Sequence, residues 1–104
     1  MNIFDLYLDK IKDLIMHLNK DGIIQLPDNL DAINVDVPPA DFNCDISTNV
    51  SLILSKINKK PPLNIANELI DIIKKSDTDI DLISVAKPGF INIKFKPIFW
   101  NNFA

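Results

Sequence analysis

The stretch that decides the fold is residues 86–95, AKPGFINIKF, which opens with a Pro-Gly turn and continues as an alternating strand. Successive side chains of a strand point to opposite faces of the sheet. One set of alternate positions forms an apolar face that we expect to lie in the core: Ile91, Ile93 and Phe95. The other set forms a mixed face: Phe90, Asn92 and Lys94.

The mixed face of this strand carries what an unpaired nucleotide needs. An aromatic ring can stack on a base, a carboxamide can read a base edge, and an ammonium group can contact a phosphate. The alternative interpretation is an edge strand with a mixed solvent face and an incidental phenylalanine. The pattern alone leaves both interpretations open.

The composition is that of one small domain. The chain has 104 residues, of which 47% are hydrophobic and 24% charged, as in ordinary globular proteins. Its net charge is -3, and all 11 basic residues are lysine. A general nucleic-acid binder needs a basic face, so we expect any contact with nucleic acid to be local and weak. A chain this short can bury one core, but hardly a catalytic cleft as well.

Several kinds of site are excluded by what the sequence lacks. Cys44 and His17 are its only cysteine and histidine. No internal disulfide can form, and the two residues are too few for a zinc site. The single histidine has no partner at a spacing that would give a nucleophile–base–orienter set. Asp41 and Asp45 fit turn and capping chemistry better than metal binding. We therefore predict a binding module with no catalytic residue and no metal site. No apolar run is long enough to span a membrane, and no signal peptide is evident.

Apolar periodicity predicts three helices, at residues 2–20, 47–57 and 62–75. Alternation predicts two further strands, at residues 32–37 and 79–86, the second irregular enough for a bulge. The short connection before Phe90 implies an antiparallel hairpin, and Pro97 can begin another helix. The predicted fold is α+β: a single domain with a small antiparallel β-sheet packed against helices.

Local features are expected to fix the ends of these elements. Gly22 should end the first helix in the left-handed conformation. Asp45 or Ser47 should cap the second helix. The buried face of the strand at 32–37 should consist of its apolar alternate residues: Ile33, Val35 and Val37.

Three blocks resemble, in the same order, the N-terminal additional domain of arginyl-tRNA synthetase. Residues 43–50, NCDISTNV, are similar to the family's Gly-Asp-aromatic-x-x-Asn segment. Residues 62–69, PLNIANEL, resemble its Pro-x-x-Ile/Leu-Ala-x-x-Leu helix. Residues 87–93, KPGFINI, resemble its Gly-Pro-Gly-Phe-Ile-Asn-Ile signature. Cys44 and Ile46 depart from the pattern, since they stand where the family has glycine and an aromatic residue.

The resemblance implies a domain that contacts the outer corner of tRNA(Arg), where the D-loop meets the T-loop, and holds the unpaired base at position 20. The family's contacts to that base fall here on Phe90, Asn92 and Lys87. Lys87 replaces a glycine or asparagine of the family, so a phosphate contact is an alternative role for it. Lys94 is a phosphate contact that the strand pattern indicates without support from the family.

The resemblance also implies how the chain is organised. Residues 1–96 are the tRNA-recognition domain, and residues 97–104 begin the linker helix toward a catalytic domain of the same polypeptide. The parent enzyme joins arginine to tRNA with ATP and magnesium, whereas this part carries no cofactor. We expect a cytoplasmic monomer with no membrane partner. The alternative is a protein–protein interaction module that uses the Phe90 strand and a surface around Trp100 and Phe103.

Overall fold

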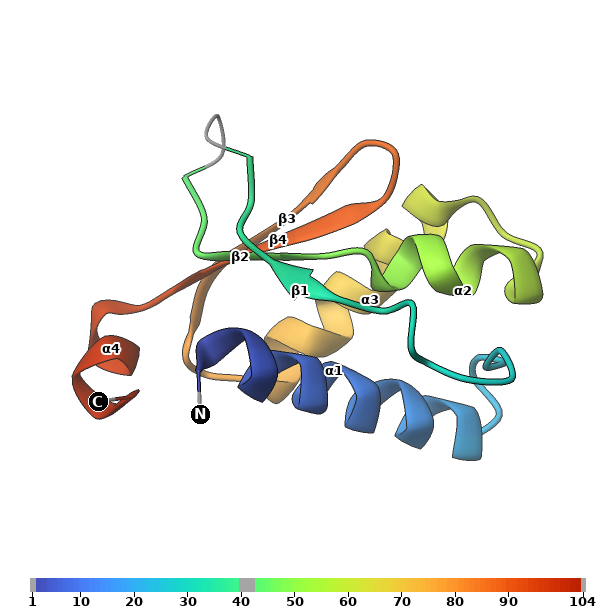
Figure 1. The fold of residues 1–104 in the computed structure, drawn as a ribbon, viewed down its shortest axis with the longest axis horizontal. Helices are drawn as coiled ribbons and strands as arrows, with labels where there is room; N and C mark the ends of the chain where they lie inside the picture. Colours follow the sequence, from blue (N-terminus) through green and yellow to red (C-terminus); the bar gives the residue numbers. More distant parts are fainter. Residues whose placement is uncertain (1, 40–42, 104) are drawn as a thin grey trace.

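A computed structural model describes residues 2–39 and 43–103, with the backbone alone at positions 102 and 103. Within these residues four helices and four strands follow one another along the chain (Figure 1). The elements are α1 (Ile3–Lys20), β1 (Val35–Asp36), β2 (Ile46–Thr48), α2 (Val50–Asn58), α3 (Pro62–Ser76), β3 (Ile80–Ala86), β4 (Phe90–Phe95) and α4 (Pro97–Phe103). The predicted α+β class is confirmed.

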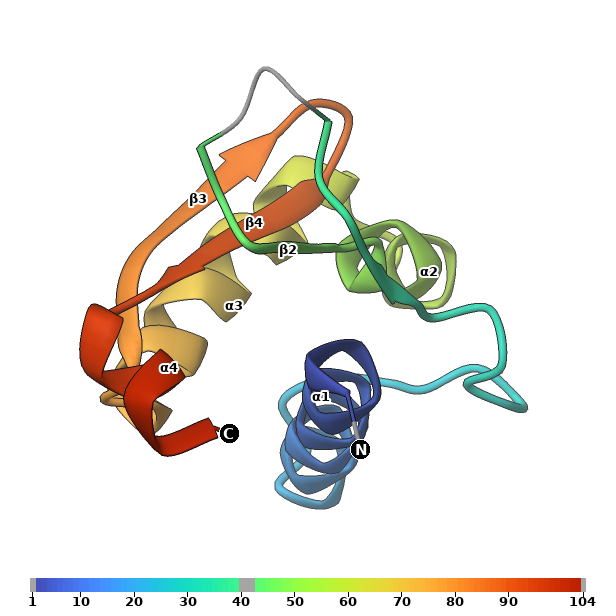
Figure 2. The same cartoon turned by 60° about the vertical axis from the view of Figure 1, so that its left-hand side comes forward.

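The four strands form one antiparallel sheet in the order β1-β2-β4-β3. β3 and β4 form the predicted hairpin, and their register shifts between Ile80 and Leu82, where an irregularity was expected. Figure 2 shows α1, α2 and α3 on one side of the sheet, which leaves the other side open. β4 is an interior strand, with β2 on one side of it and β3 on the other. One of its faces therefore packs against the helix layer, and the other belongs to this open face.

The core lies between the sheet and the helices. The apolar face of β4 is buried as predicted, with Ile91, Ile93 and Phe95 at most 2% exposed. α1 contributes a stripe of buried residues: Ile3, Tyr7, Ile11, Ile15 and Leu18. The ring of Phe99 in α4 stacks on that of Phe95 with their centroids 4.4 Å apart, so α4 also packs on the core.

The predicted helix at 47–57 begins too early, because β2 was missed. Ile46, Ser47 and Thr48 are all buried and pair with β1 on one side and β4 on the other. Ladder pairing on both sides holds these residues extended, so α2 begins only at Val50. Neither predicted cap was right, since Asn49 occupies the N-cap position and makes no side-chain capping bond.

The predicted strand at 32–37 is also shorter than expected. Ile33 is buried but Val37 is 70% exposed, so the three apolar residues do not share a buried face. The Val37 N–H bonds the side chain of Asp36 (2.8 Å) instead of the ladder, and the next residue is a proline, which has no N–H to donate. The ladder therefore ends at Asp36.

The end of α1 and the start of α4 are as predicted. Gly22 follows Asp21, the C-cap residue of α1, and has φ 78°, as predicted for a residue that ends a helix. A helix begins at Pro97, as predicted. Asp41 and the side chain of Phe103 lie outside the described residues.

Candidate nucleic-acid interface

The open face of the sheet carries a row of polar side chains. The cross-strand register aligns one residue from each strand: Asp36, Ser47, Asn92 and Ser84. Directly opposite residues of antiparallel strands share a face and lie about 5 Å apart. The row therefore places a carboxylate, two hydroxyls and a carboxamide in one line across the sheet.

A pocket of about 330 Å³ lies on this face, near the lower end of the usual size range of ligand pockets. Its walls come from β1 and the segment after it, from β2, and from the β3–β4 hairpin: Asn34, Asp36, Val37, Pro39, Ser47, Ala86, Lys87, Phe90 and Asn92. The pocket thus brings together three of the four predicted site residues. Lys94 does not line it.

Asn92 is the unusual member of the pocket. It shares the open face with Phe90 as predicted, yet its side chain is buried, with 1% exposed. Neither the amide nitrogen nor the amide oxygen has a hydrogen-bond partner in the described part of the chain. Leaving such a buried group unpaired costs about 1–3 kcal/mol, so native proteins rarely keep one without a reason. A carboxamide offers donors and acceptors to a base edge.

Phe90 and Lys87 lie at the mouth of the pocket, and both are exposed. Their position depends on the β3–β4 turn, in which Gly89 N donates to Ala86 O (3.0 Å). Gly89 is buried, and a Cβ added there would lie 2.5 Å from the Cβ of Pro62 at the start of α3. The turn therefore packs closely against the start of α3, and this contact fixes the position of Phe90 and Lys87.

Lys94 lies farther along the same face. It is half-buried and pairs across the hairpin with Leu82, which is 57% exposed. Lys94 also acts on the Cys44 thiol. Burial of this thiol, followed by the charge of Asp45, raises its pKa, and the positive charge of Lys94 partly offsets that rise. Lys94 is two residues from Asn92, or roughly 7 Å along a strand, so the structure places it beside the pocket and not within it.

The two departures from the family-like block at 43–50 leave the fold intact. Among the described residues, Lys59 and Gly22 have positive φ but Cys44 does not, so no glycine is required at that position. Ile46 is 1% exposed and belongs to the core, where an apolar side chain replaces an aromatic one.

Two residues that position the pocket were missed from sequence. Asn49 accepts from Asn34 N (2.8 Å) and donates to Ala32 O (3.0 Å), which holds the segment that leads into β1. The Asp45 carboxylate accepts from Phe95 N (2.8 Å), which ties β2 to β4. Both residues occupy the Asp and Asn positions of the family-like block, and this was the one signal that could have identified them.

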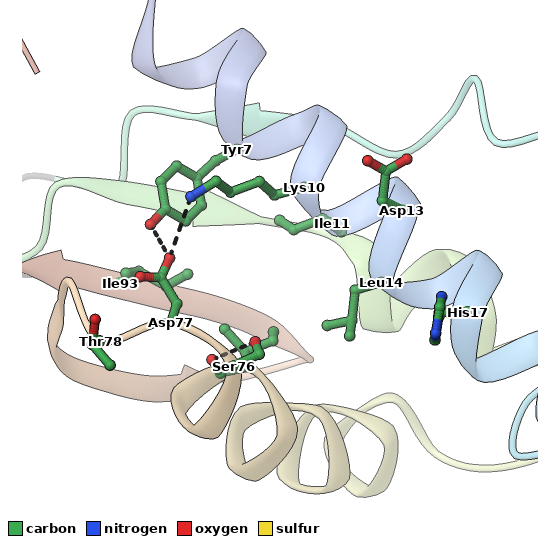
Figure 3. A pocket seen from close by; sticks show the side chains of 11 residues that line it. Tyr7, Lys10, Ile11, Asp13, Leu14, His17, Ser76, Asp77, Thr78 and Ile93 are labelled. Atoms are coloured by element: carbon green, nitrogen blue, oxygen red, sulfur yellow. Dashed lines mark hydrogen bonds and ion pairs between the residues drawn. The ribbon is translucent and has the colours of Figure 1, made fainter.

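A second hollow, of about 470 Å³, separates α1 from the end of α3 (Figure 3). The Tyr7 hydroxyl donates to the Asp77 carboxylate, and Lys10 Nζ lies 3.8 Å from the same carboxylate. Burial, followed by the bond to Asp77, raises the pKa of Tyr7 well above its ordinary value. His17 is exposed in this wall, as expected of a surface histidine. Tyr7, Lys10 and Asp77 thus pair with one another and hold α1 against the α3–β3 turn.

The described residues contain no group of three His, Cys, Asp or Glu side chains arranged to hold a metal ion. In the same part of the chain no helix is both long and apolar enough to cross a membrane.

The fold defines a class of small α+β domain, with helices on one face of an antiparallel sheet and a pocket on the other. Comparison with known families identifies it further: the profile described as the arginyl tRNA synthetase N terminal domain matches residues 7–95. The chain belongs to this family, as its three sequence blocks indicated.

Curated relatives agree with the family match. The chain is 66% identical over 103 residues to the arginine–tRNA ligase of Pelagibacter ubique (strain HTCC1062), covering 99% of this chain and 18% of that relative. It is 35% identical over 102 residues to the arginine–tRNA ligase of Bartonella quintana (strain Toulouse), covering 98% and 17%. The Bartonella bacilliformis (strain ATCC 35685 / KC583 / Herrer 020/F12,63) enzyme of the same name is 36% identical over 104 residues, covering 98% and 17%. The chain thus spans less than a fifth of the length of these relatives.

Proposed function

We propose that this chain is the tRNA-binding domain of an arginine–tRNA ligase and that its open-face pocket holds the unpaired D-loop base at position 20 of tRNA(Arg). The observation that carries the proposal is the buried carboxamide of Asn92, which has no hydrogen-bond partner among the described residues and lies in a pocket with Phe90 at its mouth. We infer that a ligand supplies the hydrogen bonds that this amide lacks within the described part of the chain.

Each group has a distinct task in this proposal. The Phe90 ring stacks on the face of the base, and stacking of this kind contributes about 1–3 kcal/mol per base. The Asn92 carboxamide bonds the base edge and so carries the sequence preference. Lys87 contacts the phosphate of the same nucleotide, and Lys94 contacts a neighbouring phosphate. Because the chain carries a net charge of -3, these few contacts supply most of its affinity.

The rest of the enzyme lies outside this domain. Residues 1–96 form the tRNA-recognition domain, and residues 97–104 begin the linker helix toward a catalytic domain of the same polypeptide. That domain joins arginine to tRNA(Arg) with ATP and magnesium, in a cytoplasmic monomer. The alternative, an interaction module built on Phe90 and Trp100, lacks the support that the family match gives to tRNA binding.

The test is aminoacylation by the complete protein that contains these residues. Phe90→Ala should lower kcat/KM for tRNA by a factor that corresponds to about 1–3 kcal/mol. Asn92→Ala should weaken discrimination among bases at position 20 more than overall affinity. Leu82→Ala is the matched control, since Leu82 is exposed on the same face but does not line the pocket. Unchanged kinetics in Phe90→Ala would refute the proposed site.

A further inference from the structure

The pocket has walls of opposite charge. Asp36 reaches it from β1, and Lys87 reaches it from the turn of the β3–β4 hairpin. Asp36 is exposed, and among the described residues no lysine lies within ion-pair distance of its carboxylate. The carboxylate is nonetheless held in place, because Oδ1 accepts from Val37 N at 2.8 Å.

Asp36 also continues the row of groups that contains Asn92. The register places Ser47 opposite Asp36 on one side and opposite Asn92 on the other. A ligand that bonds the Asn92 carboxamide can therefore extend in one of two directions. One leads across Ser47 toward the Asp36 carboxylate, and the other leads toward the β3–β4 hairpin. The charges decide between these directions: a phosphate is attracted to Lys87 and repelled by Asp36, so the base edge points toward Asp36.

An ionised carboxylate can only accept hydrogen bonds. Adenine, cytosine and guanine carry exocyclic amino groups that donate, whereas an unpaired uracil presents its single donor, N3–H, between two carbonyl oxygens that the carboxylate repels. We propose that Asp36 is a specificity-determining residue of this pocket and selects a base with an exocyclic amino group. This inference rests on the proposed function, since it assumes that the pocket holds a base.

The inference is tested by deleting the two partners separately and together. Binding of the complete protein is measured to tRNA transcripts that carry adenosine, purine riboside or an abasic site at position 20; purine riboside is adenosine without its amino group. With the unmodified protein, we expect adenosine to bind roughly tenfold more tightly than purine riboside. In Asp36→Ala the ratio of the two dissociation constants should fall to about one, as expected when one of two interacting groups is missing.

Asp31→Ala is the matched control for charge. Asp31 is an exposed acid a few residues before β1 that does not line the pocket, so its removal changes the overall attraction to RNA without touching the base. We expect Asp31→Ala to shift all three dissociation constants together and to leave the ratio of adenosine to purine riboside near tenfold. Equal affinity of Asp36→Ala and Asp31→Ala for the abasic transcript would show that the Asp36 variant is folded and that the lost ratio belongs to Asp36.

The outcomes separate this inference from the proposed function. If the unmodified protein binds abasic and adenosine transcripts equally, no base occupies the pocket and both proposals are overturned. If the abasic site weakens binding while Asp36→Ala keeps the tenfold ratio, the pocket reads the base without Asp36 and only the present inference is overturned. Loss of the ratio in Asp36→Ala, but not in Asp31→Ala, supports it.

Discussion

Replacing Asn92 by leucine should separate stability from tRNA recognition. Leucine has a similar branched shape but no polar atoms, so Asn92→Leu removes a buried carboxamide that has no partner in the described structure. In most buried positions a polar-to-apolar change breaks hydrogen bonds, but here it breaks none that the described residues make. The free protein should therefore tolerate the substitution, while the tRNA complex should lose the groups that bond the base.

The expected magnitude follows from comparison with a second asparagine. The amide of Asn92, which has no partner among the described residues, costs about 1–3 kcal/mol of stability. Leucine removes this cost, but because it is larger, packing strain cancels up to a similar amount. The free energy of unfolding of Asn92→Leu should thus equal or exceed that of the unmodified protein. Asn49 bonds Asn34 N and Ala32 O, so Asn49→Leu should lower the free energy of unfolding by about 1 kcal/mol for each bond lost.

The assay is urea unfolding of both variants beside tRNA binding by the complete protein. Asn92→Leu should keep its unfolding midpoint and lose most of its preference for the base at position 20. If Asn92→Leu is destabilised as much as Asn49→Leu, then the carboxamide of Asn92 does have a partner in the free protein. The carboxamide of Asn92 would then not be free to bond a ligand.

Two further predictions concern the parts that hold the pocket in place. Gly89→Ala places a Cβ 2.5 Å from that of Pro62, nearly 1 Å closer than ordinary contact, so it should destabilise the protein by about 1–3 kcal/mol and weaken binding to a transcript with adenosine at position 20. Adding Pro62→Gly to the same protein should restore both stability and binding. If it does not, the contact between Gly89 and Pro62 does not position the pocket. The raised pKa of Tyr7 means that the folded state holds the phenolic proton more tightly, so stability should fall above the unfolded pKa of about 10, by up to about 1.4 kcal/mol per pH unit. Urea unfolding from pH 9 to 11 should show this added loss relative to Tyr7→Phe, and parallel pH profiles would refute it.

The hairpin was predictable from sequence because its signals are local. The turn at Lys87–Gly89 and the alternation of residues 90–95 lie within ten consecutive residues, and they fix the strand, its partner and its buried face. β2 was not predictable, because its three residues precede a helical pattern and are held extended by pairing with strands far away in the sequence.

The candidate site was predicted only on the strand that carries it. Phe90, Asn92 and Lys87 come from the hairpin, and their types alone indicated a base-binding face. The opposite wall, from Asp36 to Pro39, was read as a strand with a buried Val37 and a proline stop. Only the pairing of β1 with β2 brings this segment beside β4, and no local pattern encodes a contact across such a separation.

The interior position of β4 has a consequence for how base preference can evolve. A one-residue slip of this strand would turn Ile91 and Ile93 out of the core, so packing and the ladders on both sides fix the register. The open face can therefore exchange side chains at Phe90 or Lys94 without any change in which way the strand faces. Related domains with altered tRNA identity rules should differ on this face while they keep the apolar residues behind it.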